Sequence, residues 1–521
     1  MSFLRAAITV SGLTMASRVF GFVRDVMAAA IMGAGPVADA FFVALRLPNF
    51  FRRMTAEGAF SVSFVPIFSR TLEQEGKESA QDFANQAMAM LLVALIPFTI
   101  LAIIFMPFVL SILAPGFASG VDGVEGRFDL AVTLTRITFG YLLFMSLAAF
   151  VGGMLNAIDK FAAYAMAPVL FNIMQILFLG LAFWFPTPGH AMAWAVLISG
   201  ALQLLWLLWV LHRNDIHLRF IWPKITDKIR RLLALMGPGM IGASAVQINL
   251  LVDTIIASTL PVGAVSYLYY ADRLTQLPLG LIGTAVGTAL LPKLAQKIAA
   301  KESGNANYLF NRALEWTFVL TLPAAAALAC IALPIISVLF ERGEFTRDAA
   351  IATAGALQAY AFGLPAFVSI KVLSTALYAQ ENTKTPVKIT LICAALNIVL
   401  CLILIRPFAH VGIAIATVIA GWVQTFILVY ILHKKNELDF DALLRRNLLR
   451  IVVSALLMSI ILLVSQTLLQ GWFIAGGIKA LLALGVIVAM GGGLYLGLVF
   501  WQNVINLKTI IQSLKGQDKL S

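Results

Sequence analysis

Charged residues are scarce in this chain, and their scarcity excludes an ordinary soluble protein. Only 12% of the 521 residues are charged, whereas 61% are hydrophobic and the mean hydropathy is +0.93. Soluble globular domains carry about 25% charged residues. The composition therefore predicts an all-α polytopic membrane protein, because apolar stretches of about 20 residues cross a bilayer as helices.

The chain is also poor in residues for metal and covalent chemistry. Its three cysteines lie in apolar runs without CxxC spacing, which favours neither a disulfide framework nor a zinc site. Its five histidines lie at the ends of apolar runs or in a polar connector. A Walker A loop, a G-x-S-x-G elbow and an HExxH motif are all missing, so we expect no enzymatic activity.

Apolar runs of spanning length recur along the chain and predict about fourteen transmembrane helices. The first run contains arginines and lacks a small-residue cleavage site, so we expect a retained helix rather than a signal peptide. Prolines such as Pro48, Pro107 and Pro365 predict kinks. The predicted spans are 8–32, 37–69, 83–113, 128–155, 161–185, 190–211, 232–260, 265–292, 308–340, 349–379, 386–405, 410–432, 447–469 and 476–501.

The chain resembles itself at an offset of about 220 residues. Gly200-Ala-Leu-Gln203 before His212-Arg213 matches Gly421-Trp-Val-Gln424 before His433-Lys434 with identical spacing. Each half holds six spans, which predicts two six-helix lobes in a parallel repeat, with the substrate site between them. The predicted parts are a lobe at 1–213, a basic cytoplasmic connector at 214–231, a lobe at 232–434, two additional helices at 435–502 and a cytoplasmic tail at 503–521.

Lysine and arginine outside the predicted spans gather on the side that holds the N-terminus. Basic residues mark the cytoplasmic side of a membrane protein, so we expect both termini to be cytoplasmic in a multi-pass protein of the bacterial plasma membrane. The same bias accounts for most of the net charge of +12. The positive charge therefore indicates how the protein is oriented in the membrane, with membrane lipids around it, and does not indicate a nucleic-acid partner.

The first two predicted spans carry ionisable residues where a membrane helix should have none. Such a group costs at least about 2.5–3.5 kcal/mol in mid-membrane and usually faces a protein interior or a watery cavity. Cations outnumber acids, which indicates a cationic chamber. Arg46 and Arg53 are also open to another interpretation, as paired or snorkelling side chains, with Glu57 four residues after Arg53. The full set is Arg18, Arg24, Asp25, Asp39, Arg46, Arg52, Arg53 and Glu57.

The second half adds further ionisable residues within its spans. Arg273 corresponds to Arg46 in the repeat, and Lys371 is either a second lining cation or a snorkelling lysine. The planar fork of arginine matches phosphate oxygens, so the arginines predict a phosphorylated or diphosphorylated headgroup as the guest. Asp253 is either a protonated carboxyl or part of a cation site with the oxygens of Asn397 and Thr417.

On these residues the chain resembles the MurJ/MviN family of lipid II flippases, within the multidrug/oligosaccharidyl-lipid/polysaccharide exporter superfamily. The resemblance covers essentially the whole chain. The motifs that carry it are Ser17-Arg18-Val-Phe-Gly-Phe-Val-Arg24-Asp25, Ala38-Asp39-Ala-Phe-Phe-Val-Ala, Leu47-Pro48-Asn49 through Arg52-Arg53 to Ala56-Glu57-Gly58-Ala59-Phe60, Tyr269-Tyr270-Ala271-Asp272-Arg273-Leu274 and Lys384-Thr-Pro-Val-Lys388.

The resemblance implies fourteen helices, a central cationic cavity, and a hydrophobic groove made with the last two helices for a polyprenyl tail. It assigns the cavity arginines to Arg18, Arg24, Arg52 and Arg273 and the important acids to Asp25 and Asp39. It also implies a sodium site at Asp253, Asn397 and Thr417. Cys401 stands where that pattern has a second aspartate.

The resemblance implies export of lipid-linked peptidoglycan precursor, lipid II, to the outer leaflet by alternating access, for cell-wall synthesis. Sodium, another coupling ion or the membrane potential would supply direction, and other cell-wall synthesis proteins are expected partners. The alternatives are an exporter of another polyprenyl-diphosphate-linked saccharide or of drugs, and a non-transporting scaffold. A pump for cationic drugs should have an acidic cavity, whereas these spans are basic.

Overall fold

The computed structural model describes residues 3–54, 60–120, 125–289, 295–297, 303–380 and 382–504, and each regular element within these ranges is a helix. A helix satisfies its own backbone hydrogen bonds, which apolar surroundings require. The chain divides into two compact units. Unit 1 comprises Met1–Ser266 and Arg342–Thr346, and unit 2 comprises Tyr267–Glu341 and Arg347–Ser521.

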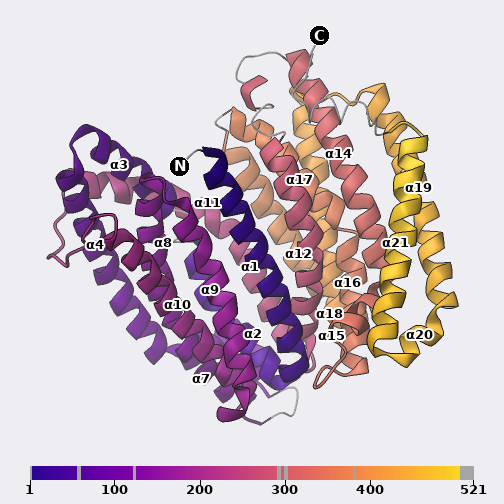
Figure 1. Ribbon diagram of the computed structural model, residues 1–521, viewed down its shortest axis with the longest axis horizontal. Coiled ribbons are helices and arrows are strands. Elements are labelled where there is room, and N and C mark those ends of the chain that lie inside the picture. The colour runs from indigo at the N-terminus through magenta and orange to yellow at the C-terminus, as the bar shows by residue number, and fades with distance from the viewer. Residues whose placement is uncertain are drawn as a thin grey trace. The chain divides into compact units, whose positions relative to one another are not determined.

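In unit 1, α1 packs against α9, α9 against α10, α10 against α8, and α2 against α7 (Figure 1). Small residues make this close packing feasible, since alanine and glycine let helix backbones approach. The helices of unit 1 are α1 (Phe3–Met32), α2 (Pro36–Phe51), α3 (Ser61–Gln74), α4 (Lys77–Ile104), α5 (Met106–Leu113), α6 (Pro115–Ala118), α7 (Arg127–Phe139), α8 (Tyr141–Ala157), α9 (Phe161–Gly180), the 3-10 helix η2 (Ala182–Trp184), α10 (Pro188–His212) and α11 (Asp227–Ser258).

In unit 2, α14 packs against α17 and α19, and α19 lies beside α21, both yellow in Figure 1. The first helix, α12 (Ala264–Ala289), starts with three residues that belong to unit 1. The others are α14 (Ser303–Cys330), α15 (Ala332–Phe340), α16 (Arg347–Ala361), α17 (Leu364–Ala379), α18 (Lys384–Lys434), α19 (Ala442–Leu468), α20 (Gln470–Ala475) and α21 (Gly477–Trp501).

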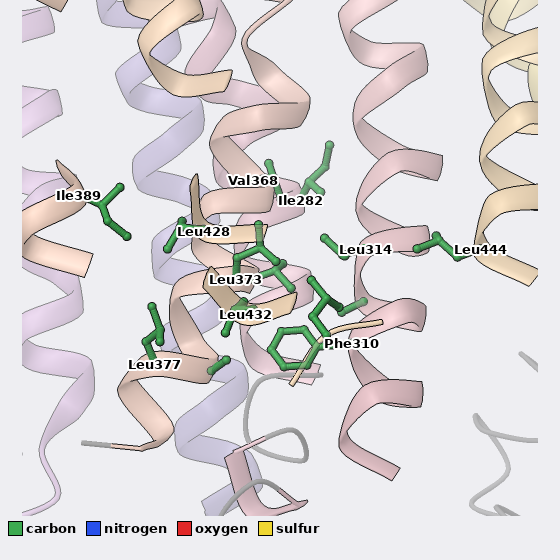
Figure 2. Packing of buried hydrophobic residues seen from close by; sticks show 14 of the residues in the cluster. Ile282, Phe310, Leu314, Val368, Leu373, Leu377, Ile389, Leu428, Leu432 and Leu444 are labelled. Carbon is green, nitrogen blue, oxygen red and sulfur yellow. The ribbon is translucent and has the colours of Figure 1, made fainter. Parts of the chain in front are cut away.

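Aliphatic and aromatic side chains from four long helices form one of the hydrophobic clusters of unit 2. Ile282 of α12, Phe310 of α14, Leu373 of α17 and Leu428 of α18 are all buried in one cluster, which Figure 2 shows. Leu444, near the start of α19, joins the same cluster. The side chains of neighbouring helices interdigitate here, so that α19 is attached to the unit by close packing as well as by chain connection.

The all-helical prediction is confirmed, and each of the fourteen predicted ranges overlaps a described helix or a pair of helices. The range 37–69 covers α2, which ends at Phe51 soon after Pro48, and α3, which begins at Ser61; residues 52–54 and 60 are also helical, so one continuous span there stays a prediction. Helices α5 and α17 start just before Pro107 and Pro365, as a proline kink predicts. Within α18 the break after Pro407 falls at Ala409, whose φ is 48°.

Nine helices in the described part of the chain are long and apolar enough to cross a membrane. Three of them run through a break, at Gly140, near Gly363 and at Ala409, and α1 and α2 are outside the nine. The number fourteen therefore stays a prediction. Helix α2 has only 16 residues, and α1 carries ionisable residues within its apolar run.

Contacts and repeat divide the chain differently. Helix α11 packs against α2, α3, α4, α5 and α6 and belongs to unit 1 by its contacts, whereas the repeat assigns it to the second half. The contacts show which helix surfaces meet in this conformation, whereas the sequence repeat reflects the ancestry of the two halves. The lobe boundaries predicted from the repeat therefore remain predictions.

A glycine turn completes unit 1 at the end of α1. The amide of Glu344 donates a hydrogen bond of 2.9 Å to the carbonyl of Ala30. Gly343 adopts φ +58°, and a Cβ there would collide with the same carbonyl, so the close approach requires glycine. The segment Arg342–Thr346 is thereby bound to the turn that leads from α1 into α2.

Candidate functional site

Arg24 of α1 is held by two partners in unit 1. Its Nε and Nη2 donate to one carboxylate oxygen of Asp25 at 3.0 and 2.7 Å. Its Nη1 donates to Oδ1 of Asn172 in α9 at 2.9 Å. Arg24 is 9% exposed and Asp25 7%. The long side chain of Arg24 thus reaches back to the carboxylate of the adjacent residue.

Asn172 connects Arg24 to the backbone of α1. Its Nδ2 donates to the carbonyl of Ser17 at 2.9 Å and to the Ser17 hydroxyl at 3.3 Å, while its Oδ1 accepts from Arg24. Ser17, Gly21 and Arg24 share one face of α1, being four and three residues apart. A Cβ on Gly21 would lie 3.4 Å from the Asn172 amide, so the missing side chain leaves room for it.

Arg24 keeps hydrogen-bonding capacity for a ligand. A guanidinium group has five N–H donors, and the three hydrogen bonds to Asp25 and Asn172 use three of them. The Arg24–Asp25 pair is neutral, so the net positive charge of the predicted span 8–32 comes from Arg18. Arg18 is half-buried and makes no ion pair with any described residue. Its position seven residues before Asp25 is about 10 Å along the helix.

The other unit 1 cations lie near the end of α2. Arg52 is half-buried just past Phe51, and its Nε donates to Oδ1 of Asn49 at 3.3 Å. Arg53 is exposed, and both arginines make further contacts. Arg46 is half-buried in α2. Glu57 lies outside the described residues, so its predicted pairing with Arg53 stays a prediction.

Asp39 lies near the start of α2 and is completely buried in a cluster that we call the Asp39 clasp. Its carboxylate accepts hydrogen bonds from Arg127 Nη2 at 2.5 Å, from the amides of Gly263 and Ser266 at 2.7 and 2.8 Å, and from the Ser266 hydroxyl at 2.5 Å. The Arg127 guanidinium also lies 3.7 Å from the centroid of the Phe117 ring. Asp39 thus joins α2 to α7 and to the first residues of α12, all within unit 1.

The Asp39 clasp differs from the expectation that Asp39 is an acid lining a cavity. Its exposed fraction is 0%, and that of Arg127 is 2%. Both carboxylate oxygens of Asp39 are occupied by donors from α7 and from the start of α12. Asp39 therefore holds α2, α7 and the start of α12 together in this structure. Any influence of Asp39 on transport acts through the positions of these helices.

The predicted cations of unit 2 lie on two helices. Arg273 of α12 is half-buried, with its Cζ 4.8 Å from the centroid of the Tyr269 ring, and the neighbouring Asp272 accepts a hydrogen bond from Gln276. Lys371 of α17 is exposed, and its Nζ lies 3.1 Å from the place a Cβ on Gly283 would occupy. Because Arg273 belongs to unit 2, its meeting with the arginines of α1 and α2 stays a prediction.

The residues implied as sodium ligands fit that ion poorly. Asn397 is 1% exposed, and its Oδ1 accepts from the Cys401 thiol at 3.6 Å. The Thr417 hydroxyl donates to the carbonyl of Ile413. Asp253 lies in unit 1, the other two in unit 2. Sodium prefers oxygen ligands, and a thiol in place of a carboxylate removes one, so the transport mechanism proposed for this protein does not use this ion.

Comparison with known proteins places these residues in a family. A sequence model of the family described as "Lipid II flippase MurJ" matches residues 28–484. The chain belongs to this family. A "Probable lipid II flippase MurJ" of Rhizobium meliloti is 42% identical over 472 residues, 89% of this chain and 87% of that protein. A relative with the same description from Rickettsia prowazekii is 34% identical and covers 97% of this chain and 99% of its own.

Solved structures support the same fold. A structure described as "Lipid II flippase MurJ, inward closed conformation" matches with a TM-score of 0.79 and 26% identity, over 96% of this chain and 100% of that one. An inward-facing multidrug resistance MATE family transporter of the MOP superfamily matches with a TM-score of 0.69 and 15% identity, over 82% of this chain and 98% of that one. The second likeness shows the fold alone.

Three polar features of the structure were missed by sequence reasoning. Two of them are the contacts of Arg127 with Asp39 and of Asn172 with Arg24, because neither Arg127 nor Asn172 carries a local sequence signal of its partner. The third is a network in which Arg312 contacts Glu315 and Asp441, while Asn447 donates to Glu315 at 2.5 Å. Arg312 and Glu315 lie within the predicted span 308–340, so the rule applied to the first two spans would have found them. The network joins α14 to the start of α19.

Proposed function

We propose that the protein moves lipid II from the cytoplasmic to the outer leaflet of the bacterial inner membrane by alternating access, for cell-wall synthesis. Family membership supports this proposal. The observation that carries it at the level of residues is Arg24, held by Asp25 and Asn172 inside a helix of spanning length, with donors left for a phosphate. Both termini are proposed to be cytoplasmic, on the distribution of lysine and arginine.

In this mechanism the arginines hold the diphosphate and the sugar-peptide headgroup in a polar path while the polyprenyl tail stays in lipid. Arg18 and Arg24 of α1, together with Arg52 and Arg273, are the proposed headgroup ligands. The helices α19 and α21 present many exposed apolar side chains, among them Leu456, Ile460 and Leu481, which suit contact with acyl or polyprenyl chains. Lys371, as an exposed cation in α17, is a candidate for the same path.

The membrane potential is the proposed source of direction. Moving one charge through 100 mV changes its free energy by about 2.3 kcal/mol. A diphosphate with two negative charges would gain roughly twice that value on leaving a negative-inside cell. No stoichiometric ion is then required, and the poor fit of the candidate sodium ligands is consistent with this source.

Depletion of the protein in its own cells tests the proposal. We expect lipid II to accumulate, its exposure at the outer leaflet to fall several-fold, and the cells to lyse, because export would be the step lost. The measurement is the fraction of lipid II accessible from outside in a leaflet-accessibility assay, with rescue by the wild-type chain. Normal lipid II exposure with drug sensitivity would indicate a drug exporter, and normal exposure with mislocalised cell-wall enzymes would indicate a scaffold.

Replacing Asn172 by alanine is expected to lower lipid II export about tenfold, because one hydrogen bond to a charged group is lost and Arg24 is no longer held in one orientation. Asn172→Asp should reduce export further, since a second carboxylate beside Arg24 repels an anionic headgroup. The matched control is Gln175→Leu, one turn along α9 and 1% exposed. Equal lipid II export by Asn172→Ala and Gln175→Leu would show that Asn172 does not position Arg24 for transport.

A further inference from the structure

The segment between α10 and α11 has no regular secondary structure and is bound along α4. We call residues 213–226 the connector strap. The side chain of Gln81 donates to the carbonyl of His217 at 2.5 Å, Asn85 accepts from the amide of Arg219 at 2.9 Å, and Gln86 accepts from the amide of Lys224 at 2.8 Å. These side chains satisfy backbone groups that a helix or sheet would otherwise pair. Figure 1 shows this loop beside α4 at the left.

The connector strap presents large apolar side chains to its surroundings. Trp222 is 81% exposed, Ile225 66% and Phe220 60%, and the Phe220 and Trp222 rings lie 6.4 Å apart. Ile216 is buried and fixes the opposite side of the strap. Two exposed aromatic rings this close together are unusual on a surface that contacts only water, because the exposure of an aromatic ring to water is unfavourable.

The strap lies at the level where apolar helix surface begins. It leaves α10 at His212 and is bound to the first turns of α4, and both helices are long and apolar enough to span a membrane. The large exposed apolar side chains of α4 start farther along, at Val93. Near the end of α10, Arg213 lies over the ring of Trp209 at 4.2 Å. Tryptophan beside arginine at the end of a span is typical of the membrane–water interface.

Basic side chains without a counter-charge accompany these rings. Lys228 pairs with Glu75 at 2.6 Å and Arg230 with Asp227 at 3.5 Å. Arg219 and Lys224, on either side of Phe220 and Trp222, are exposed and form no ion pair with any described residue. The strap therefore combines two available cations with two rings that favour the boundary between headgroups and acyl chains.

We propose that the connector strap is a binding site for anionic phospholipid headgroups of the bilayer that surrounds the protein. The phosphate groups would contact the side chains of Arg219 and Lys224, and the rings of Phe220 and Trp222 would insert at the acyl boundary. A bilayer is the occupant that supplies both chemistries at once, because clustered basic residues next to a span attract anionic lipid while interfacial aromatic rings enter it. The site uses none of the proposed headgroup ligands for lipid II.

The test compares binding of phosphatidylglycerol and phosphatidylcholine to the full-length protein in detergent, by native mass spectrometry. We expect the double variant Arg219→Gln and Lys224→Gln to bind phosphatidylglycerol roughly thirtyfold more weakly than wild type, with phosphatidylcholine binding unchanged. Both residues hydrogen-bond to α4 through their backbone amides, so these substitutions leave the strap attached. Trp222→Ala should weaken binding of both lipids.

The matched control removes the same charge elsewhere. Lys434→Gln with Lys435→Gln lowers the net charge equally at the exposed end of α18. We expect it to reduce phosphatidylglycerol binding much less than the strap variant. An equal reduction by both variants would show that net charge alone attracts lipid, and unchanged binding in the strap variant would show that the strap takes no lipid; either result overturns the proposal. Lipid II export is measured in parallel, so a failure of transport is distinguished from a loss of lipid binding.

Discussion

Asp39→Ala is expected to destabilise the protein by about 3–5 kcal/mol, the largest effect we expect from a single substitution in unit 1. It leaves the Arg127 guanidinium, 2% exposed, without its carboxylate and removes the acceptor for the amides of Gly263 and Ser266. A buried charge that has lost its partner costs far more than the pair contributed. The measurement is the thermal unfolding midpoint in detergent, together with the amount of protein in the membrane.

Asp129→Ala is the matched control, because Asp129 is an exposed carboxylate in the same first turn of α7 as Arg127. We expect its effect to lie within about 0.5 kcal/mol. Replacing Asp39 by leucine and Arg127 by methionine together should recover part of the lost stability, since no charge is then left buried. An unfolding midpoint for Asp39→Ala equal to that of Asp129→Ala would contradict the clasp.

Arg24→Lys is expected to lower lipid II export at least tenfold while leaving the unfolding midpoint close to that of the wild type. Lysine keeps the charge beside Asp25 but offers one nitrogen in place of a planar fork. A single ammonium cannot contact Asp25, Asn172 and a phosphate with the geometry that Nε, Nη1 and Nη2 provide. Each hydrogen bond to a charged group contributes roughly 1.5–3 kcal/mol, which corresponds to a tenfold change or more.

Arg70→Lys serves as the control for this substitution, because Arg70 is exposed on α3 and its Nε bonds only the neighbouring Gln74. We expect full export from it. The combination of Arg24→Ala with Asp25→Ala should fold as well as the wild type, since no buried charge is unpaired, and should still fail to export. Full export by Arg24→Lys would show that the site needs only a positive charge at this position.

Local sequence was sufficient for much of the fold. Hydropathy over windows of spanning length predicted the helices, and Pro107 and Pro365 marked breaks that the structure confirms. The α-helix α2 ends at Phe51, within one turn of Pro48, where a proline kink was expected. Ionisable residues inside spans pointed to Arg18, Arg24 and Asp39 because their cost in lipid is large wherever they lie.

Partners of these ionisable residues could not be obtained in the same way. Asp39 and Arg127 are 88 residues apart, and Arg24 and Asn172 are 148 apart. Side chains of adjacent residues on a helix point about 100° apart, so the pairing of Arg24 with Asp25 was not an obvious expectation either. The contact of Asn172 with Arg24 depends on the packing of α9 against Gly21 of α1.

Hydropathy and charge therefore determine that this chain is a bundle of apolar helices with costly ions near its N-terminus, because each residue's transfer free energy depends on its own chemistry. Which ions are neutralised depends on contacts between helices distant in the sequence. In the Asp39 clasp, the charge of Asp39 is paired with that of Arg127 inside unit 1. Arg24, in contrast, is oriented by its hydrogen bonds and keeps further N–H donors for a ligand. Only packing makes that distinction, since a carboxylate or guanidinium group changes its role with the donors and acceptors that the fold brings within 3 Å.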